Sequence, residues 1–298
     1  MADKKRILIV DDDPVVHRLL SVALRAPDRE LVSACDGLEG LGLVTGGHWD
    51  LVLTDILMPG IDGMALLERI HALRPELPVI VMTAAGTAEH VVGALRDHAF
   101  AWFSKPFAVE SVRDMVDRAL HNHCCDDDIE IISASPRWLG LRLRCKLETA
   151  TRILQFIREM EHRLPPDEED AVAAAFREIL LNGIEHGGGN DPAKSVTITY
   201  VRAEHALLYY VRDPGKGFSF DQLKHAAISN SADDPLEHVE RRAQLGMRSG
   251  GFGILMTRSL VDELIYNECG NEVLLIKYLK SPAKSPQPVP DIAIKSNP

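Results

Sequence analysis

The stretch RILIVDDD, at residues 6–13, decides the fold of the first part of the chain. A nearly continuous run of Ile, Leu and Val is typical of a strand buried on both faces of a parallel sheet. Four further runs of this kind follow, and stretches with helical periodicity separate them. The predicted strands are 6–10, 31–35, 50–55, 78–83 and 101–105, and the predicted helices are 14–26, 37–45, 63–73, 87–98 and 107–121. Five such units predict an α/β domain over residues 1–121, with a five-stranded, parallel, doubly wound sheet covered by helices.

Polar residues whose side chains can bind ligands or react follow four of these strands. Ligands of such sheets bind at the carboxyl ends of the strands, where the sequence places Asp11, Asp12, Asp55, Thr83 and Lys105. Adjacent carboxylates repel one another, and a hard cation such as Mg²⁺ relieves that repulsion. Asp55 is then a nucleophile toward a phosphoryl donor, and the Lys105 ammonium and Thr83 hydroxyl can bind phosphoryl oxygens. The alternative, acidic residues that only solvate loops, does not account for five matching positions in order.

Residues 4–121 resemble the receiver domain of two-component response regulators, on the motifs VDDD, TDILMPGIDG, MTAAG and SKPF. The resemblance implies that Asp55 is the phosphoacceptor and that an upstream histidine kinase phosphorylates it. It implies that Asp12 binds Mg²⁺, that Asp11 orders the water shell of the metal, and that the Leu57 carbonyl completes the site. Thr83 and Lys105 would sense the phosphoryl group.

The same resemblance raises two expectations about the last strand of the sheet. The Lys105–Pro106 peptide bond is expected to be cis, since the cis form costs little before proline. Trp102 stands where receiver domains usually have Tyr or Phe. We expect this larger ring to rotate inward less freely than the usual side chain.

The second part of the chain has a different order of predicted strands and helices. We interpret residues 122–135 as a linker, 136–280 as a second domain and 281–298 as a disordered tail rich in Pro, Ser and Lys. The predicted strands are 137–145, 194–201, 206–212, 263–268 and 272–279, the predicted helices are 146–163, 167–187 and 250–262, and 214–248 is rich in loops. This order predicts an α+β two-layer sandwich, with one mixed sheet backed by helices.

Three motifs in this domain carry chemistry. Glu178, Asn182 and His186 are spaced i, i+4, i+8, so they share a face of the predicted helix and could hold Mg²⁺ beside a triphosphate. In DPGKGF, residues 213–218, the Asp could accept a hydrogen bond from an adenine amino group. The glycines of GGFG, residues 250–253, open a helix and can cradle phosphate. Each motif alone could be a polar helix face, a turn or a plain helix start, but the three in order argue for nucleotide binding.

Residues 137–280 resemble the ATPase fold shared by histidine kinases, gyrase and Hsp90 chaperones, and more narrowly the anti-sigma factor serine kinases. The motifs are AFREILLNGIEHG, VRDPGKGF and RSGGFGILMTRSLVDEL. The resemblance implies that Asn182 binds Mg²⁺, that Asp213 reads adenine, and that Glu178 is the general base for a substrate serine. The glycines that would shape the ATP phosphate loops are Gly215, Gly217, Gly251 and Gly253. Gly183 replaces the usual Ala, which costs about 1 kcal/mol of helix propensity.

Composition limits the remaining possibilities. A net charge of −11 argues against direct nucleic-acid binding, which needs a basic surface. Five cysteines without a disulfide framework indicate a reducing, cytoplasmic compartment, and no signal peptide or membrane-spanning run is expected. His121, His123, Cys124 and Cys125 could bind zinc, although adjacent cysteines rarely give tetrahedral geometry. The alternative is a helix C-terminus at which histidines favour the helix dipole.

The expected function is a response regulator that controls an ATP-dependent serine protein kinase of the anti-sigma type. It would phosphorylate a serine of an anti-sigma antagonist, sequester a sigma factor, or both, and the protein would form a homodimer by resemblance. The alternative is a nucleotide-gated module that binds its partner without phosphotransfer. A histidine kinase is disfavoured, because the chain has neither a dimerising hairpin nor a phosphoacceptor histidine motif.

Overall fold

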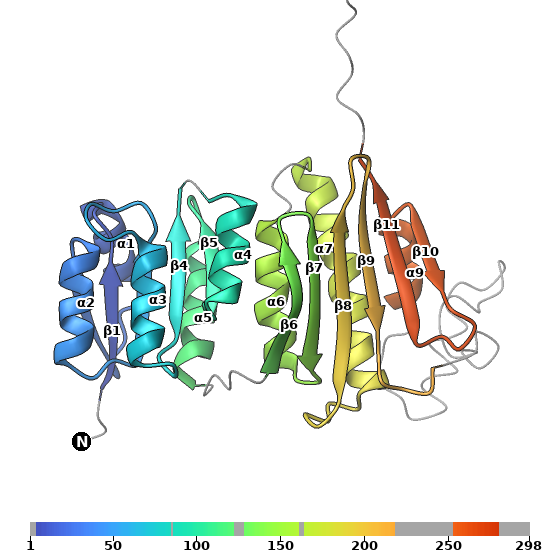
Figure 1. Cartoon of the computed structure of the whole chain (residues 1–298), viewed down its shortest axis with the longest axis horizontal. Coiled ribbons are helices and arrows are strands. Elements are labelled where there is room, and N and C mark those ends of the chain that lie inside the picture. The colour runs from blue at the N-terminus through green and yellow to red at the C-terminus, as the bar shows by residue number, and fades with distance from the viewer. Residues whose placement is uncertain (1–3, 85, 122–127, 161–163, 218–252, 280–298) are drawn as a thin grey trace, which may run out of the picture.

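The computed structural model describes residues 4–84, 86–121, 128–160, 164–217 and 253–279, and Figure 1 shows its arrangement. The predicted tail at 281–298 and the greater part of the loop-rich stretch at 214–248 lie outside these residues. Within them, no helix combines the length and the apolar character that crossing a membrane requires.

The first domain alternates strands and helices as predicted. Its elements are β1 (Lys5–Val10), α1 (Pro14–Ala23), β2 (Arg29–Ala34), α2 (Gly37–Gly46), β3 (Leu51–Asp55), α3 (Gly63–Leu73), β4 (Val79–Thr83), α4 (Ala88–Arg96), β5 (Ala101–Ser104) and α5 (Val109–His121). The strands form one parallel sheet in the order β2-β1-β3-β4-β5. All residues of β3 and β4 are buried, because helices cover both faces of the sheet.

Short polar side chains start the helices that follow β1, β2 and β4. Asp13 accepts a hydrogen bond from Val15 N (2.8 Å), Asp36 accepts one from Glu39 N (2.8 Å), and Thr87 accepts one from His90 N (3.3 Å). Each oxygen satisfies a backbone donor that has no partner inside its helix. The third acidic residue of the opening stretch therefore caps α1.

The second domain is an α+β sandwich, so the predicted fold class is confirmed. Its elements are β6 (Ile129–Ser135), β7 (Trp138–Arg144), α6 (Leu147–Glu159), α7 (Pro166–Asn182), a π-helical turn η2 (Gly183–Gly187), β8 (Ser195–Arg202), β9 (Ala206–Arg212), α9 (Gly253–Leu260), β10 (Glu263–Tyr266) and β11 (Glu272–Tyr278). The strand order is β10-β11-β9-β8-β7-β6. Alternate residues of β7, β8 and β9 are buried, and they form one core with residues of α6 and α7.

Three details differ from the sequence-based expectation. The second sheet is not mixed, since every pairing between its described strands is antiparallel. Residues 129–135 were expected to belong to the linker, but they form β6. This strand pairs with β7 and is an edge strand of the second sheet. The helix predicted to reach residue 187 changes at Gly183 into the π turn.

The two domains are in contact (Figure 1), and α6 lies beside β5, which is an edge strand of the first sheet. Hydrogen bonds join them: the Gln155 side-chain amide donates to the Trp102 carbonyl at 3.0 Å, and the Ser104 hydroxyl donates to Glu159 at 2.6 Å. Arg96 at the end of α4 also donates to the carbonyl of Ala134 in β6.

Candidate functional site

The first site lies at the carboxyl ends of β1, β3 and β5. The ligand atoms of Asp11, Asp12 and Asp55 all lie within 4.8 Å of one another. Lys105 Nζ donates to Asp11 Oδ2 (2.7 Å) and to Asp55 Oδ2 (2.6 Å). The structure therefore brings four of the five predicted residues together, and the fifth, Thr83, is buried at the end of the neighbouring strand β4.

Burial and charge act against each other in this cluster. Burial raises the pKa of Asp11, and the hydrogen bonds from Lys105 and from the Asp13 N–H only partly oppose it. Burial would lower the pKa of Lys105, but its hydrogen bonds to Asp11 and Asp55 raise the pKa overall. One ammonium faces three carboxylates, so the cluster keeps an excess of negative charge. Carboxylate oxygens in this number fit a hard divalent cation such as Mg²⁺.

The backbone around Asp55 holds its carboxylate in place. Asp55 Oδ1 accepts hydrogen bonds from the N–H groups of Ile56 (2.6 Å) and Leu57 (3.3 Å). Gly63 lets the chain return beside β3, because a Cβ atom there would overlap the Asp55 carbonyl. A nearly buried carboxylate with fixed orientation beside an ammonium is arranged to react with a phosphoryl donor.

Trp102 is fully buried in β5, and the expected cis peptide bond is present between Lys105 and Pro106. A Cβ atom on Gly86 would lie 2.6 Å from the indole ring and 3.1 Å from a methyl carbon of Thr83. The absence of a side chain at Gly86 thus makes room for the larger ring beside Thr83. Among the described residues, the indole N–H has no hydrogen-bond partner.

The second site lies where α7, β9 and α9 meet. Glu178 and Asn182 are both half-buried on one face of α7, and Asn182 Nδ2 donates to Glu178 Oε1 at 3.3 Å. His186 does not continue this face, because it lies in the π turn, where it is exposed. The wider turn changes the rotation per residue, so the i, i+4, i+8 expectation holds only for its first step.

Asp213 follows β9 and packs against small residues. Its Oδ1 accepts a hydrogen bond from Gly215 N at 2.7 Å, and burial raises the pKa of its carboxyl group. A Cβ atom on Gly187 would overlap the Asp213 carboxylate, and one on Gly183 would lie 3.4 Å from its Cβ atom. The glycine that replaces the usual Ala thus lies directly beside Asp213.

The predicted phosphate-loop glycines are only partly described. Gly217 has a positive φ of 75°, which side chains rarely adopt, and a Cβ atom there would overlap the Cys269 carbonyl. Gly253 begins α9 beside Glu178. Gly251 lies outside the described residues, as do His123, Cys124 and Cys125 of the possible zinc cluster.

Two residues near this site were not predicted. Asn271 accepts a hydrogen bond from Asp213 N through its carbonyl (3.0 Å), and its side chain donates to the Gly215 carbonyl (3.3 Å). Burial and the charges of Glu178 and Asp213 raise the pKa of Tyr266 to about 12. Asn271 comes to the site because β11 pairs with β9, and Tyr266 because β10 pairs with β11, so the local sequence carried no signal for them.

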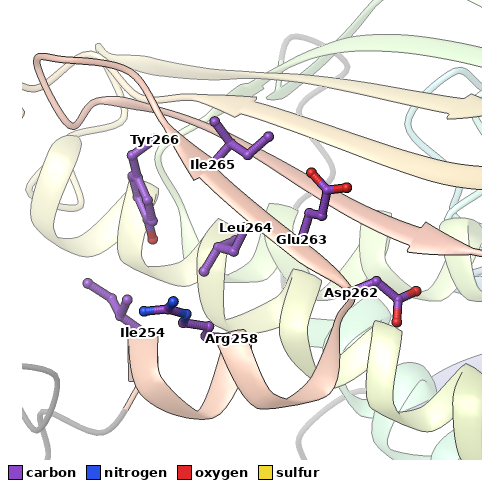
Figure 2. A pocket seen from close by; sticks show the side chains of 7 residues that line it. All are labelled: Ile254, Arg258, Asp262, Glu263, Leu264, Ile265 and Tyr266. Carbon is purple, nitrogen blue, oxygen red and sulfur yellow. The ribbon is translucent and has the colours of Figure 1, made fainter.

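A cavity of about 530 Å³ lies between α9 and β10. Figure 2 shows Leu264 and Tyr266 pointing from β10 toward α9, whereas Ile265 points to the other side. The residues that line it are Ile254, Arg258, Asp262, Glu263, Leu264, Ile265 and Tyr266. None of them belongs to the predicted sites, and Tyr266 connects the cavity electrostatically with Glu178 and Asp213.

Comparisons with known families match each of the two domains. Residues 7–117 match the response regulator receiver domain, and residues 143–277 match the histidine kinase-like ATPase domain. The chain thus combines a receiver domain with a histidine kinase-like ATPase domain.

Curated relatives are similar to less than half of the chain. The transcriptional regulatory protein GlrR of Escherichia coli is 32% identical over 145 residues, which are 47% of this chain and 33% of the relative. The regulatory protein AtoC of E. coli is 38% identical over 137 residues, 45% of this chain and 30% of the relative. The chain therefore spans about a third of the length of these relatives.

Solved structures match a similar share. A CheY-like receiver domain protein from Methanospirillum hungatei is 32% identical, with a TM-score of 0.38, over 40% of this chain and 94% of that one. The response regulator TrrA from Thermotoga maritima, in complex with Mg²⁺-BeF, is 31% identical, with a TM-score of 0.36, over 39% and 99%.

Proposed function

We propose that the chain is a response regulator, phosphorylated on Asp55 by a histidine kinase, whose output is an ATP-dependent serine protein kinase of the anti-sigma type. The observation that carries the proposal is the pairing of two sites. A carboxylate cluster with Lys105 stands at one sheet edge, and Glu178 with Asn182 stands beside the helix start at Gly253. The receiver corresponds to residues 1–121 and the output to the sandwich domain.

In the receiver, an Asp55 oxygen attacks the phosphorus of a phosphohistidine. The O–P bond forms as the P–N bond breaks, and the leaving imidazole nitrogen keeps the electron pair and takes up a proton. Asp11, Asp12 and Asp55 would hold Mg²⁺, which when bound neutralises charge on the phosphoryl oxygens. Lys105 already donates to Asp55 and can donate to the phosphoryl group in the same position.

In the output domain, the hydroxyl oxygen of a substrate serine attacks the γ-phosphorus of ATP, and ADP leaves. Glu178 accepts the proton of that hydroxyl group. Asn182 would bind Mg²⁺, and Asp213 would accept a hydrogen bond from the adenine amino group. Gly215, Gly217, Gly251 and Gly253 would let the backbone approach the phosphates. We assign no role in this chemistry to His186, which is exposed in the π turn after Asn182.

The output would phosphorylate a serine of an anti-sigma antagonist, sequester a sigma factor, or both, so the test of the kinase is phosphoserine formation on candidate antagonists. Glu178→Gln should reduce transfer by at least about a hundredfold, since it removes the base, while ATP affinity stays within about threefold. Glu185→Gln is the matched control, because Glu185 is an exposed acidic residue in the adjacent π turn. Equal loss in both variants would contradict the assigned role of Glu178.

The second candidate is a nucleotide-gated module that binds its partner without phosphotransfer. This candidate is favoured because Glu178 accepts a hydrogen bond from Asn182 and lies against Gly253. Both contacts also suit a structural role for Glu178. ATP-dependent partner binding that survives Glu178→Gln, without phosphoserine in the wild type, would support this candidate. Mass measurement with and without phosphorylation tests the proposed homodimer.

A further inference from the structure

The edge of β5 is covered by α6 of the other domain. An edge strand has backbone groups without partners in its own sheet. Arg152 Nε donates to the Phe100 carbonyl at 3.2 Å, and Gln155 Nε2 donates to the Trp102 carbonyl at 3.0 Å. Alternate strand residues rise about 6.6 Å, and residues three to four apart on a helix rise about 4.5–6 Å. One face of α6 thus runs along the strand edge.

The third contact of this face is the most buried. Glu159 is 9% exposed, and its oxygens accept hydrogen bonds from Ser104 Oγ (2.6 Å) and from Gln155 Nε2 (3.1 Å). Hydrogen bonds to a charged acceptor are stronger than neutral ones, and a low local dielectric strengthens them further. The Arg152 guanidinium also lies 4.7 Å from the centre of the Phe100 ring. The contact between the two domains is therefore specific in geometry.

The contact between α6 and β5 lies between the receiver site and the site on α7. Ser104 directly precedes Lys105, whose N–H donates to the Thr83 carbonyl at 2.7 Å and whose ammonium donates to Asp55. On the other side, α6 packs in one hydrophobic core with α7, which carries Glu178 and Asn182. A phosphoryl group on Asp55 adds charge next to Lys105, at the end of the strand that α6 covers.

We propose that the Ser104–Glu159 hydrogen bond is a latch that stabilises the unphosphorylated receiver, and that phosphorylation of Asp55 opens it and releases α6. This inference deepens the proposed function and rests on phosphorylation of Asp55. By thermodynamic reciprocity, a latch that phosphorylation opens must itself oppose phosphorylation. Breaking the latch should therefore favour the phosphorylated form, whatever the chemistry of the ATPase domain.

The experiment measures binding of beryllofluoride with Mg²⁺, a mimic of the phosphoryl group, to the full-length protein by titration calorimetry. Ser104→Ala removes the donor, and Glu159→Gln removes the charge on the acceptor. Each should lower the Kd for beryllofluoride about fivefold or more, the size of a typical coupling. The double variant should resemble the single ones, because both changes break the same contact. Glu148→Gln, an exposed acidic residue of α6, should leave the Kd unchanged.

A second measurement reports on α6 itself. Amide hydrogen exchange over residues 147–159 should quicken when beryllofluoride binds the wild type, and it should already be fast in the Ser104→Ala variant. If Glu159→Gln does not fold, Ser104→Ala decides alone, since it removes only a hydroxyl group. Unchanged or weaker beryllofluoride binding in that variant would overturn the latch. Neither readout involves serine phosphorylation, so the latch can fail while the kinase assignment stands, and the reverse.

Discussion

Gly253 at the start of α9 lies so close to Glu178 of α7 that a Cβ atom there would overlap Oε1 of the carboxylate. The two residues are 75 positions apart in the sequence (253 − 178). Their approach joins the motif proposed to supply the base with the motif proposed to bind phosphate. The size of residue 253 therefore controls where the Glu178 carboxylate can lie.

Gly253→Ala should displace the Glu178 carboxylate without unfolding the domain, because a flexible side-chain end can move aside. Serine phosphorylation should fall at least about tenfold, since small misplacement of a catalytic group is costly. The measurement is initial rate with saturating ATP. Gly42→Ala is the control: nothing lies within 4 Å of its Cβ position in α2, so it should stabilise by about 0.5–1 kcal/mol and leave activity intact. Full activity of Gly253→Ala would contradict this role.

Asp12→Asn should weaken Mg²⁺ binding about tenfold or more, because it removes one carboxylate from a cluster of three. Removal of Mg²⁺ by a chelator should abolish phosphorylation of the receiver by acetyl phosphate. Asp13→Asn is the matched control: Asp13 caps α1, and Asn caps a helix equally well. Similar Mg²⁺ affinities in the two variants would exclude Asp12 as a ligand.

Lys105→Met should destabilise the receiver by about 3 kcal/mol in metal-free buffer, since it leaves Asp11 and Asp55 as buried charges without their partner. Added Mg²⁺ should restore part of this loss, because the cation replaces the missing positive charge. Urea unfolding with and without Mg²⁺ measures both effects. Arg142→Gln, which breaks an exposed ion pair with Glu130, should cost less than about 1 kcal/mol. A Lys105→Met variant as stable as the wild type would exclude this role for Lys105.

Asp50 predicts a pH dependence of stability. Burial would raise the pKa of its carboxyl group, but hydrogen bonds from Arg6 N (2.8 Å) and Lys5 Nζ (2.9 Å) lower the pKa below the ordinary value of 3.8. A lowered folded-state pKa stabilises the protein above the unfolded pKa, and this stabilisation is lost as pH falls through the folded pKa.

Asp50→Asn should therefore cost about 1 kcal/mol at neutral pH, and the difference from the wild type should shrink in acid. Urea unfolding at neutral and at acidic pH measures this difference in the free energy of unfolding. Glu30→Gln breaks a more exposed ion pair with Arg6 and should have almost no effect at either pH. A constant difference between Asp50→Asn and the wild type would show that the carboxylate charge is not the cause.

The apolar runs of the sequence predicted the receiver fold well, because strands buried on both faces leave a strong apolar signal. Their ends placed Asp11 and Asp12 at the site, but the pattern gave no role to Asp13, which caps α1 in the structure. The pattern was also too weak to predict β6, since a half-exposed edge strand acquires its structure from pairing with β7.

The sequence by itself determined which chemical groups the chain carries and the strands and helices that present them, since apolar periodicity and glycine motifs are local properties. Only the tertiary structure decided which groups meet. It placed His186 in an exposed π turn, brought Gly253 against Glu178, and placed Glu159 against Ser104. These contacts join distant segments, and the close packing that creates them depends on the whole core, which no local pattern records.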